Sequence, residues 1–488
     1  MTNDNTQPAA APAPRIAILG GGPGGYEAAL VAKRLGADVT IVERHGFGGS
    51  TVLTDVVPSK TLIATAEWMA LGGAAAELGI RINDESGTET QTISADLNAI
   101  NARIRSLALT QSEDIAHRLV SSNIRTIHGQ GRLVSAKEIA VTGITDTVGK
   151  PQPDEVISAD YIIVAVGAAP RVLPTAQPDG ERILTWTQLY NLSELPKHLI
   201  VVGSGVTGAE FAGAYHALGT EVTLVSSRDR VLPGEDADAA ELIEDVFRTR
   251  GMHVMSKSRA KAAAVVGEGE DKHVEVTLED GRVVTGSHVL MAVGSVPNTQ
   301  DIGLEEVGIN TSPSGHVVTD KVSRTSVNGV YAAGDCTGVF PLASVAAMQG
   351  RIAVAHALGD TVRPIKLRSV AANIFTAPEI ATVGYTQEQL EKLDMRYTIT
   401  KLPLRVNPRA KMMGARAGFV KLFSRTESGT VVGGVIVAPR ASELIYPITL
   451  AVSHRLTVDD VADAFTVYPS LTGSIAEVAR MGHQITQD

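Results

Sequence analysis

Two glycine-rich turns are the segments of this chain whose residue types and spacing could do chemistry. In such a turn one glycine makes the tight bend, the next lets a pyrophosphate approach the backbone, and the third lets helix and strand pack closely. The helix that follows offers free N–H groups and the positive end of its dipole to the phosphates. Both turns predict phosphate binding, with a purely structural turn as the alternative. The two sets are Gly20, Gly22 and Gly25, and Gly203, Gly205 and Gly208.

The segments around the first turn have the lengths of a βαβ unit. Residues 15–20 are an apolar run typical of a buried parallel strand, residues 26–35 an alanine-rich helix, and residues 37–43 a second strand. Glu43 ends this second strand, 18 residues after Gly25. An acid at this place holds ribose hydroxyls, so the context favours a dinucleotide site over a plain turn.

The same arrangement recurs 183 residues later. We expect a strand over residues 198–203, a helix over residues 209–218 and a strand over residues 221–225. The repeat also has a common end, because residues 165–170 (AVGAAP) match residues 292–297 (AVGSVP). The chain therefore contains two copies of one nucleotide-binding fold.

The second copy lacks the acid that Glu43 provides in the first. Its second strand is followed by Ser226, Ser227 and Arg228, with Arg230 close behind. A ribose 2′-phosphate is dianionic, is repelled by a carboxylate and is favoured by Arg and Ser donors. The sequence therefore predicts a preference for NADPH over NADH. The alternatives are that NADH is used and that the arginines are solvated loop charges.

Composition limits the class of protein. The 488 residues suggest about three domains, and a net charge of -10 argues against a nucleic-acid partner. The single cysteine, Cys336, excludes an intramolecular disulfide and is typical of a reducing compartment. Residues 1–14 have the composition of a disordered tail, and no apolar run approaches the roughly 18 residues that span a bilayer. We expect a cytoplasmic protein with no integral membrane segment and no metal site.

A third signature lies in residues 325–335, where a strand of small residues delivers Asp335 to a tight turn. Here the chain resembles the flavoprotein disulfide reductases, such as dihydrolipoamide dehydrogenase and glutathione reductase, from Arg15 to its C-terminus. The motifs that carry the resemblance are the two glycine turns, Gly48-Gly49 leading to Pro58-Ser59-Lys60, residues 165–170, Ala332-Ala333-Gly334-Asp335, and residues 375–384.

The resemblance implies an α/β fold with two Rossmann-like domains, for FAD and NAD(P), and a C-terminal α+β domain that forms a homodimer. The implied divisions are a tail (1–14), an FAD-binding domain (15–170), an NAD(P)-binding domain (171–296), a second FAD-domain segment (297–365) and a dimerisation domain (366–488). Cofactor binding is implied for the six turn glycines, for Glu43, Ser50, Thr51, Lys60, Gly131, Gly167, Asp335 and Ala343, and for Ser226, Ser227, Arg228 and Gly294.

The resemblance also implies how charges meet the flavin. Lys60 is expected near flavin N5, paired with Glu210 on the helix of the second turn. A paired carboxylate keeps a buried lysine protonated, and the alternative is a structural salt bridge between domains. The helix that begins near Ala343, after Leu342, is expected to point its N-terminus at the flavin pyrimidine, where it would stabilise negative charge.

The chain departs from the family where thiol chemistry is done. The two redox-cysteine positions, between Gly48-Gly49 and Lys60, fall on Thr51 and Val56. Tyr468 and Gly473 replace the C-terminal acid–base His and Glu. Neither Thr nor Val can be a thiolate nucleophile or a two-electron store. We therefore expect no disulfide reductase activity.

A flavin without a thiol relay must pass electrons directly to its acceptor. Quinones are planar and accept two electrons without nucleophilic catalysis, and the chain resembles the cysteine-less members of the family that are NAD(P)H:quinone reductases. We expect the Tyr468 hydroxyl to donate to a quinone oxygen, unless Tyr468 only packs in the dimer interface. The rival functions are a soluble pyridine nucleotide transhydrogenase and a redox-responsive FAD protein that binds a partner with little turnover.

Overall fold

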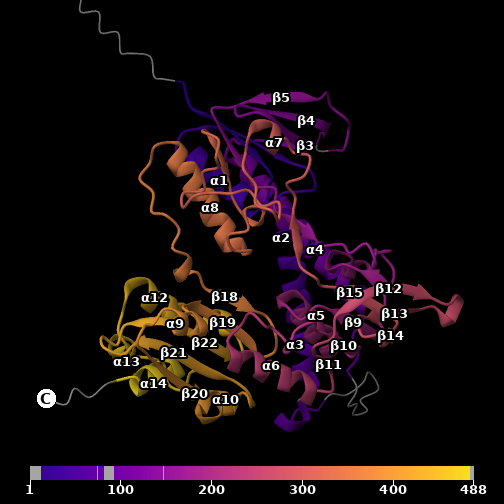
Figure 1. Ribbon diagram of the computed structural model, residues 1–488, viewed down its shortest axis with the longest axis vertical. Helices are drawn as coiled ribbons and strands as arrows, with labels where there is room; N and C mark the ends of the chain where they lie inside the picture. The colour runs from indigo at the N-terminus through magenta and orange to yellow at the C-terminus, as the bar shows by residue number, and fades with distance from the viewer. Residues whose placement is uncertain (1–11, 74, 82–92, 147, 484–488) are drawn as a thin grey trace, which may run out of the picture. The chain divides into compact units, whose positions relative to one another are not determined.

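The computed structural model describes residues 12–73, 75–81, 93–146 and 148–483, so residues 1–11 of the predicted tail lie outside it. The described chain divides into two compact units. Unit 1 comprises residues 1–57, 106–169 and 295–365, and unit 2 comprises residues 58–105, 170–294 and 366–488. Figure 1 labels their helices and strands.

Unit 1 is built on a seven-stranded sheet in the order β17-β6-β1-β2-β3-β4-β5, in which β17 to β3 are parallel and β3 to β5 antiparallel. The strands are β1 (Arg15–Leu19), β2 (Asp38–Glu43), β3 (Arg125–Ser135), β4 (Glu138–Thr145), β5 (Glu155–Ser158), β6 (Tyr161–Val164) and β17 (Val330–Ala332). Asp160 lies between β5 and β6, and its carboxylate accepts a hydrogen bond from the Arg15 N–H at 2.8 Å.

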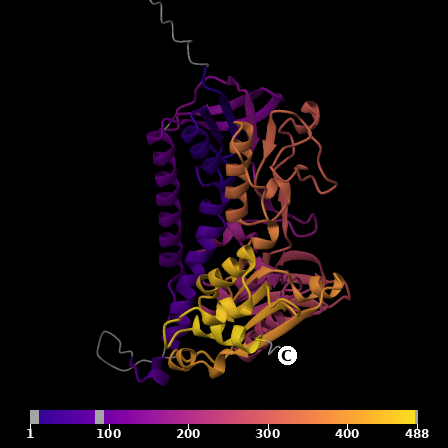
Figure 2. The same ribbon diagram turned by 90° about the vertical axis from the view of Figure 1, so that its left-hand side faces the viewer.

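Helices cover this sheet. They include α1 (Pro23–Arg34), α2 (Gly49–Leu53), α7 (Leu304–Val307), α8 (Ala343–Ala357) and the C-terminal part of α4 (Leu97–Ser121). In both views α1 and α8 run side by side (Figures 1 and 2). They approach closely because Gly350 has no side chain: a Cβ there would lie 2.1 Å from the Gly24 carbonyl oxygen. Their apolar faces join those of β1 and β2 in one core cluster.

The first lobe of unit 2 repeats this design with a five-stranded parallel sheet in the order β11-β10-β9-β15-β8. A three-stranded antiparallel sheet, β12-β13-β14, accompanies it. The strands are β8 (Ile183–Leu184), β9 (His198–Val202), β10 (Glu221–Val225), β11 (His253–Met255), β12 (Ala260–Val266), β13 (His273–Leu278), β14 (Val283–Gly286) and β15 (His288–Met291), and the helices are α3 (Val56–Gly73), α5 (Val206–Ala217) and α6 (Ala237–Thr249).

The second lobe of unit 2 is an antiparallel sheet in the order β18-β19-β22-β21-β20, and the last helices of the chain, drawn in yellow, belong to it (Figure 2). Its strands are β18 (Ala372–Ile374), β19 (Glu379–Gly384), β20 (Tyr397–Pro403), β21 (Phe419–Arg425) and β22 (Val431–Ala438). Its helices are α9 (Gln387–Lys392), α10 (Pro408–Met412), α11 (Ala441–Leu444), α12 (Tyr446–His454), α13 (Val458–Asp463) and α14 (Gly473–Met481). The two lobes share an apolar core, in which Phe247 of α6 and Phe423 of β21 are buried in one cluster.

The predicted fold class is confirmed, and the starts of two helices differ from the prediction. The helices after the two glycine turns begin at Pro23 and Val206, three residues earlier than predicted, because the last glycines of each turn already have helical hydrogen bonds. In the first turn the Tyr26 N–H donates to the Gly22 carbonyl at 2.9 Å. Residues 441–454 form two helices, α11 and α12, and Pro447 stands in the first turn of α12.

Candidate functional site

The first glycine turn needs glycine for reasons visible in the backbone. Gly20 has a φ of 107°, and a Cβ there would lie 2.2 Å from the Ala165 carbonyl oxygen. A Cβ on Gly25 would lie 1.8 Å from the Gly20 carbonyl oxygen. Gly22 differs, because a Cβ there would meet no protein atom within 4 Å. The space beside Gly22 is open, and α1 begins there without a side-chain cap, so the residues fit a bound pyrophosphate.

Glu43 accepts hydrogen bonds from backbone N–H groups in and near this turn. Its two carboxylate oxygens accept hydrogen bonds from the backbone N–H groups of Gly21 and His45, each at 2.7 Å. Each oxygen has a second lone pair for which no described residue is a donor. Glu43 stands at the end of β2, and its role toward ribose hydroxyls stays a prediction.

Asp335 follows β17 in the same unit. It comes directly after Gly334, whose φ is 84°. Burial raises the pKa of Asp335, and His316 partly opposes that effect. Among the described residues no donor to the Asp335 carboxylate is found, so this half-buried acid fits a ligand with hydroxyl donors. Helix α8 begins at Ala343, as predicted, and has no side-chain cap.

The other residues of unit 1 that the sequence assigned to the cofactor have mixed surroundings. Ser50 and Thr51 lie in the short helix α2. Gly167 has a φ of 66° and open space around its Cα. Gly131 is buried in β3, where a Cβ would lie 2.3 Å from the Leu19 side chain. Packing therefore explains this glycine, and a contact with a cofactor would have to come from its backbone.

The second glycine turn has nearly the same backbone geometry as the first. Gly203 has a φ of 109°, and its Cβ would lie 2.2 Å from the Ala292 carbonyl oxygen. A Cβ on Gly208 would lie 1.8 Å from the Gly203 carbonyl oxygen, and one on Gly205 would meet nothing within 4 Å. Helix α5 also begins without a side-chain cap. This turn fits a second dinucleotide.

Ser226 occupies the place of Glu43 in the second copy, since the strand pairs of the two copies have the same register. Its hydroxyl is 2.7 Å from the Ser204 hydroxyl and accepts from the Arg228 N–H at 3.1 Å. The side chain is fully buried, which argues against the predicted role of Ser226 in phosphate binding. Ser227 and Arg228 remain as exposed donors of the loop. Within the described chain the Arg228 guanidinium has no hydrogen-bonded or ionic partner.

Gly294 ends the second copy as Gly167 ends the first. Its φ is 93°, and a Cβ there would meet no atom within 4 Å. Its carbonyl accepts a hydrogen bond from the Arg171 N–H at 2.9 Å. The glycine is needed for the backbone conformation, and its surroundings leave room for a ligand.

Lys60 and Glu210 form the predicted pair, with Nζ 2.7 Å from a carboxylate oxygen. Glu210 is 4% exposed, and its second oxygen accepts from the Phe375 N–H at 2.8 Å. The Lys60 ammonium also lies 4.9 Å from the centre of the Phe375 ring. The sequence placed Phe375 in a family motif but did not predict its contact with Glu210, because this hydrogen bond comes from the backbone and carries no residue-type signal.

The positions of the missing thiols lie in two successive helices. Thr51 is inside α2, and Val56 begins α3. The one cysteine, Cys336, is fully buried in unit 1, where its Sγ donates to the Ala333 carbonyl at 3.3 Å. Burial raises the pKa of the Cys336 thiol to about 12. Cys336 is therefore a small core residue and no reactive thiol.

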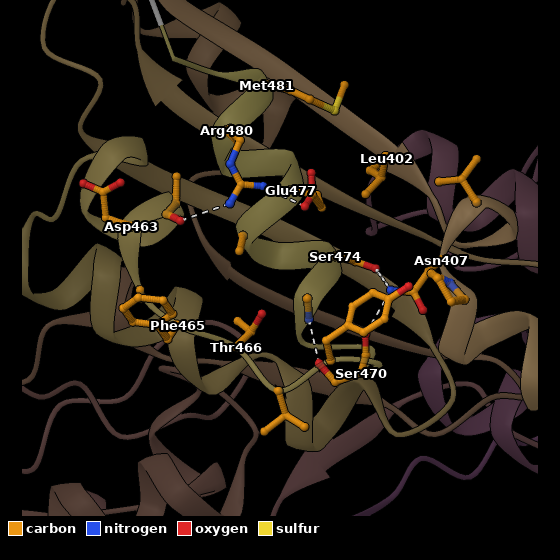
Figure 3. Close-up of a pocket in the computed structure, with 18 residues that line it drawn as sticks. Leu402, Asn407, Asp463, Phe465, Thr466, Ser470, Ser474, Glu477, Arg480 and Met481 are labelled. Atoms are coloured by element: carbon orange, nitrogen blue, oxygen red, sulfur yellow. Dashed lines mark hydrogen bonds and ion pairs between the residues drawn. The ribbon is translucent and has the colours of Figure 1, made fainter.

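Tyr468 lies on the loop between α13 and α14 and is 82% exposed. The loop borders a cavity of about 600 Å³ (Figure 3). The Asn407 side chain donates to Ser470 O at 2.9 Å and to the Ser474 hydroxyl at 2.7 Å. These bonds anchor one end of the loop, and none of the described residues forms a hydrogen bond with the Tyr468 hydroxyl. Gly473 begins α14.

Comparison with known proteins gives the class of this protein. Residues 14–350 match the pyridine nucleotide-disulphide oxidoreductase family model, and residues 370–479 match the dimerisation domain of that family. The chain belongs to the pyridine nucleotide-disulphide oxidoreductase family. Among the residues that the structure describes, no helix is long and apolar enough to cross a membrane, and no group of three His, Cys, Asp or Glu residues could hold a metal ion.

Individual relatives narrow this class. The chain is 52% identical over 470 residues to the NAD(P)H dehydrogenase (quinone) of Mycobacterium tuberculosis, covering 96% of this chain and 93% of that protein. It is 32% identical to the dihydrolipoyl dehydrogenase of Bacillus subtilis, covering 95% of each. The solved structure of LpdA from Mycobacterium tuberculosis aligns with a TM-score of 0.89 at 50% identity, over 96% of this chain and all of that one.

Proposed function

We propose that this protein is an FAD-dependent NAD(P)H dehydrogenase that delivers electrons directly to a quinone. One observation carries the proposal: the Lys60–Glu210 pair is kept, while Thr51 and Val56 stand at both redox-cysteine positions. Without a dithiol the acceptor must reach the flavin itself. The relative that is 52% identical bears the name of such a quinone-reducing enzyme.

FAD is the cofactor that the residues of unit 1 would hold. Its pyrophosphate would lie at the open Gly22 and the uncapped start of α1, its ribose hydroxyls at Glu43, and its ribityl chain at Asp335. Bound FAD would supply the two-electron carrier that a protein without redox cysteines lacks. The uncapped start of α8 would present backbone N–H groups to negative charge on the ring.

The proposed role of Lys60 is to place one fixed positive charge near the flavin ring. Glu210 and the Phe375 ring keep the ammonium in place, and the hydrogen bond from the Phe375 N–H orients Glu210. The test is the rate of flavin reduction by NADPH in stopped flow for Lys60→Met. We expect at least a roughly tenfold slower reduction with the flavin content unchanged. An unchanged rate would make the pair a structural salt bridge.

NADPH is the proposed electron donor. Arg228 and Ser227 are exposed after β10, and no carboxylate stands at the Ser226 position to repel a 2′-phosphate. A comparison of kcat/KM for NADPH and NADH with one quinone decides this part of the proposal.

We further propose a homodimer in which Tyr468 serves the acceptor. The chain carries the family's dimerisation domain, and the loop of Tyr468 exposes the apolar side chains of Phe465 and Val467. A tyrosine hydroxyl can donate a hydrogen bond to a quinone oxygen. Tyr468→Phe removes only that hydrogen bond. Full quinone turnover by this variant would end the proton-donor role and leave Tyr468 as a packing residue.

An acceptor screen tests the whole proposal. The purified holoenzyme is given NADPH or NADH with menadione, thio-NAD, oxygen, lipoamide or glutathione disulfide. We expect the highest flavin-normalised rate with the quinone and no turnover of either disulfide. A faster transfer to thio-NAD would identify a transhydrogenase, and rates near zero with every acceptor would indicate a redox-responsive binding protein. A cytoplasmic location remains a prediction, which cell fractionation checks.

A further inference from the structure

A buried lysine of the C-terminal lobe holds the start of a helix in the nucleotide-binding lobe. Lys421 lies in β21, and its side chain is 4% exposed. Its Nζ donates to Asp236 at 2.9 Å, to Asp238 at 3.0 Å and to the Gln387 side-chain oxygen at 3.0 Å. All three ammonium donors are therefore used, which is the condition under which a buried charge is tolerated.

Asp236 connects this contact to the start of α6 and to the loop before it. It is the N-cap of α6, where one carboxylate oxygen accepts from the Ala239 N–H at 3.4 Å and the other accepts from Lys421. Burial alone would lower the pKa of Lys421, but the hydrogen bonds to Asp236 and Asp238 outweigh it and raise the pKa. The protonated form of Lys421 is thus favoured, and its ammonium is bonded to the N-cap residue of α6.

The segment just before Asp236 is the loop that follows β10, residues 226–236, and it carries Arg228. The Leu232 N–H donates to the Ser204 carbonyl inside the second glycine turn at 2.8 Å, and the Val231 N–H donates to the Glu244 carboxylate at 3.0 Å. At the other end of the loop, its last residue is Asp236. Within the described chain the only ionic contact of Asp236 is with Lys421. The loop is therefore tied to the glycine turn on one side and to the C-terminal lobe on the other.

A second charge of the C-terminal lobe faces the same loop. The pKa of Glu388, beside Gln387 at the start of α9, is lowered first by its hydrogen bond with Lys392 and further by Arg230 of the loop. Glu388 is exposed, so solvent screens this attraction. Of these two charged contacts from the C-terminal lobe, the Lys421 contact is the buried one, and it adds to the bonds that the loop makes with Ser204 and Glu244.

We propose that Lys421 is a positioning residue for nucleotide binding, which holds the 226–236 loop through Asp236 so that Arg228 meets the ribose end of NAD(P)H. The inference rests on the proposed function, in which the second glycine turn takes NAD(P)H. A pre-positioned loop lowers the entropy lost on binding. We expect loss of the Lys421 contact to lower the affinity for the nucleotide and to leave the rate of the chemical step unaltered.

The test compares Lys421→Met, Asp236→Asn and the control Lys401→Met in the holoenzyme. Lys401 contacts the same Asp238 at 2.9 Å but is 40% exposed and does not reach Asp236. We expect Lys421→Met to raise the KM for NADPH about tenfold, with kcat changed less than about twofold. The dissociation constant of adenosine 2′,5′-bisphosphate should rise in parallel. Asp236→Asn keeps the helix cap, because Asn caps as well as Asp, and should raise the same KM several-fold.

Three results would overturn the proposal: an unchanged KM in both Lys421→Met and Asp236→Asn, a KM rise as large in Lys401→Met, or a lower melting temperature with unaltered nucleotide affinity. Asp236→Asn decides alone if Lys421→Met does not fold. Failure of the proposed NADPH preference gives a different pattern. The wild type would then use both nucleotides equally, and Lys421→Met would still raise both KM values.

Discussion

The two glycine turns of this protein share one backbone and differ at one strand end. The φ angles of Gly20 and Gly203 are 107° and 109°, and the forbidden Cβ contacts are 2.2 Å in both. After the second strand the first copy places Glu43, and the second places Ser226. The same type of glycine turn thus serves two cofactors. The two copies differ in chemistry at the residue after the second strand, where a ribose is expected to bind.

The difference between Glu43 and Ser226 is accompanied by a difference within the glycine turn, where Gly21 of the first copy corresponds to Ser204 of the second. In the first copy a Cβ on Gly21 would lie 2.9 Å from the Phe47 ring and 3.1 Å from the Glu43 Cγ, so Phe47 and Glu43 together favour a glycine there. In the second copy the short Ser226 leaves room for Ser204, and the two hydroxyls are 2.7 Å apart. The Arg228 N–H donates to Ser226 where the His45 N–H donates to Glu43. Two residues, therefore, must change together to convert one copy into the other.

The largest effect is expected from a side chain at the third glycine of either turn. Gly25→Ala puts a Cβ 1.8 Å from the Gly20 carbonyl oxygen, and we expect the purified protein to lose its flavin absorbance. Gly208→Ala makes the same clash in the second copy, and we expect normal flavin content with no reduction by NADPH. Spectra before and after NADPH addition measure both. A Gly208→Ala protein without flavin would show that the two copies are not independent.

A smaller but more specific effect is expected from copying the first ribose position into the second. Ser204→Gly with Ser226→Glu reproduces the Gly21–Glu43 pair. The new carboxylate repels a 2′-phosphate and accepts from ribose hydroxyls. We expect the ratio of kcat/KM for NADPH over NADH to fall by roughly 100-fold, the effect of about 2.7 kcal/mol. The single variant Ser226→Glu, which crowds Ser204, is the control, and an unchanged ratio in the double variant would contradict the comparison.

Arg228→Gln is expected to act on NADPH alone. Loss of a charge-assisted hydrogen bond to the 2′-phosphate should raise the KM for NADPH about tenfold. The KM for NADH should stay within about twofold, because NADH has no 2′-phosphate. Equal changes for both nucleotides would mean that Arg228 is a loop charge without a role in selectivity.

The smallest effect is expected at Cys336, which belongs to the first copy only. Its pKa of about 12 keeps the thiol protonated, so Cys336→Ala should leave kcat/KM within about twofold from pH 6 to 9. The folded pKa lies above the unfolded value, so the thiol's contribution to the free energy of unfolding is complete below about pH 9 and is lost as pH rises toward 12. Denaturant titrations of both proteins should show this slope in the wild type only. Labelling of the native protein by iodoacetamide at neutral pH would contradict the burial.

Much of the site follows from local sequence rules. Gly20, Gly25, Gly203 and Gly208 are required by backbone geometry within a few residues, and that geometry can be inferred from spacing alone. The pairing of Lys60 with Glu210 followed only from a family resemblance, because 150 residues separate the two. The starts of α1 and α5 were placed three residues late, since glycine and proline hide the first helical turn.

The sequence by itself determined the two phosphate cradles, the missing acid after β10 and the missing thiols, because each depends on which side chain stands at a position. The tertiary structure alone decided that Ser226 turns inward to Ser204, that the Phe375 backbone orients Glu210, and that Lys421 reaches Asp236 from another lobe. These are contacts between distant segments. Their partners depend on packing, and a buried polar group takes whichever partner the fold brings within hydrogen-bond reach.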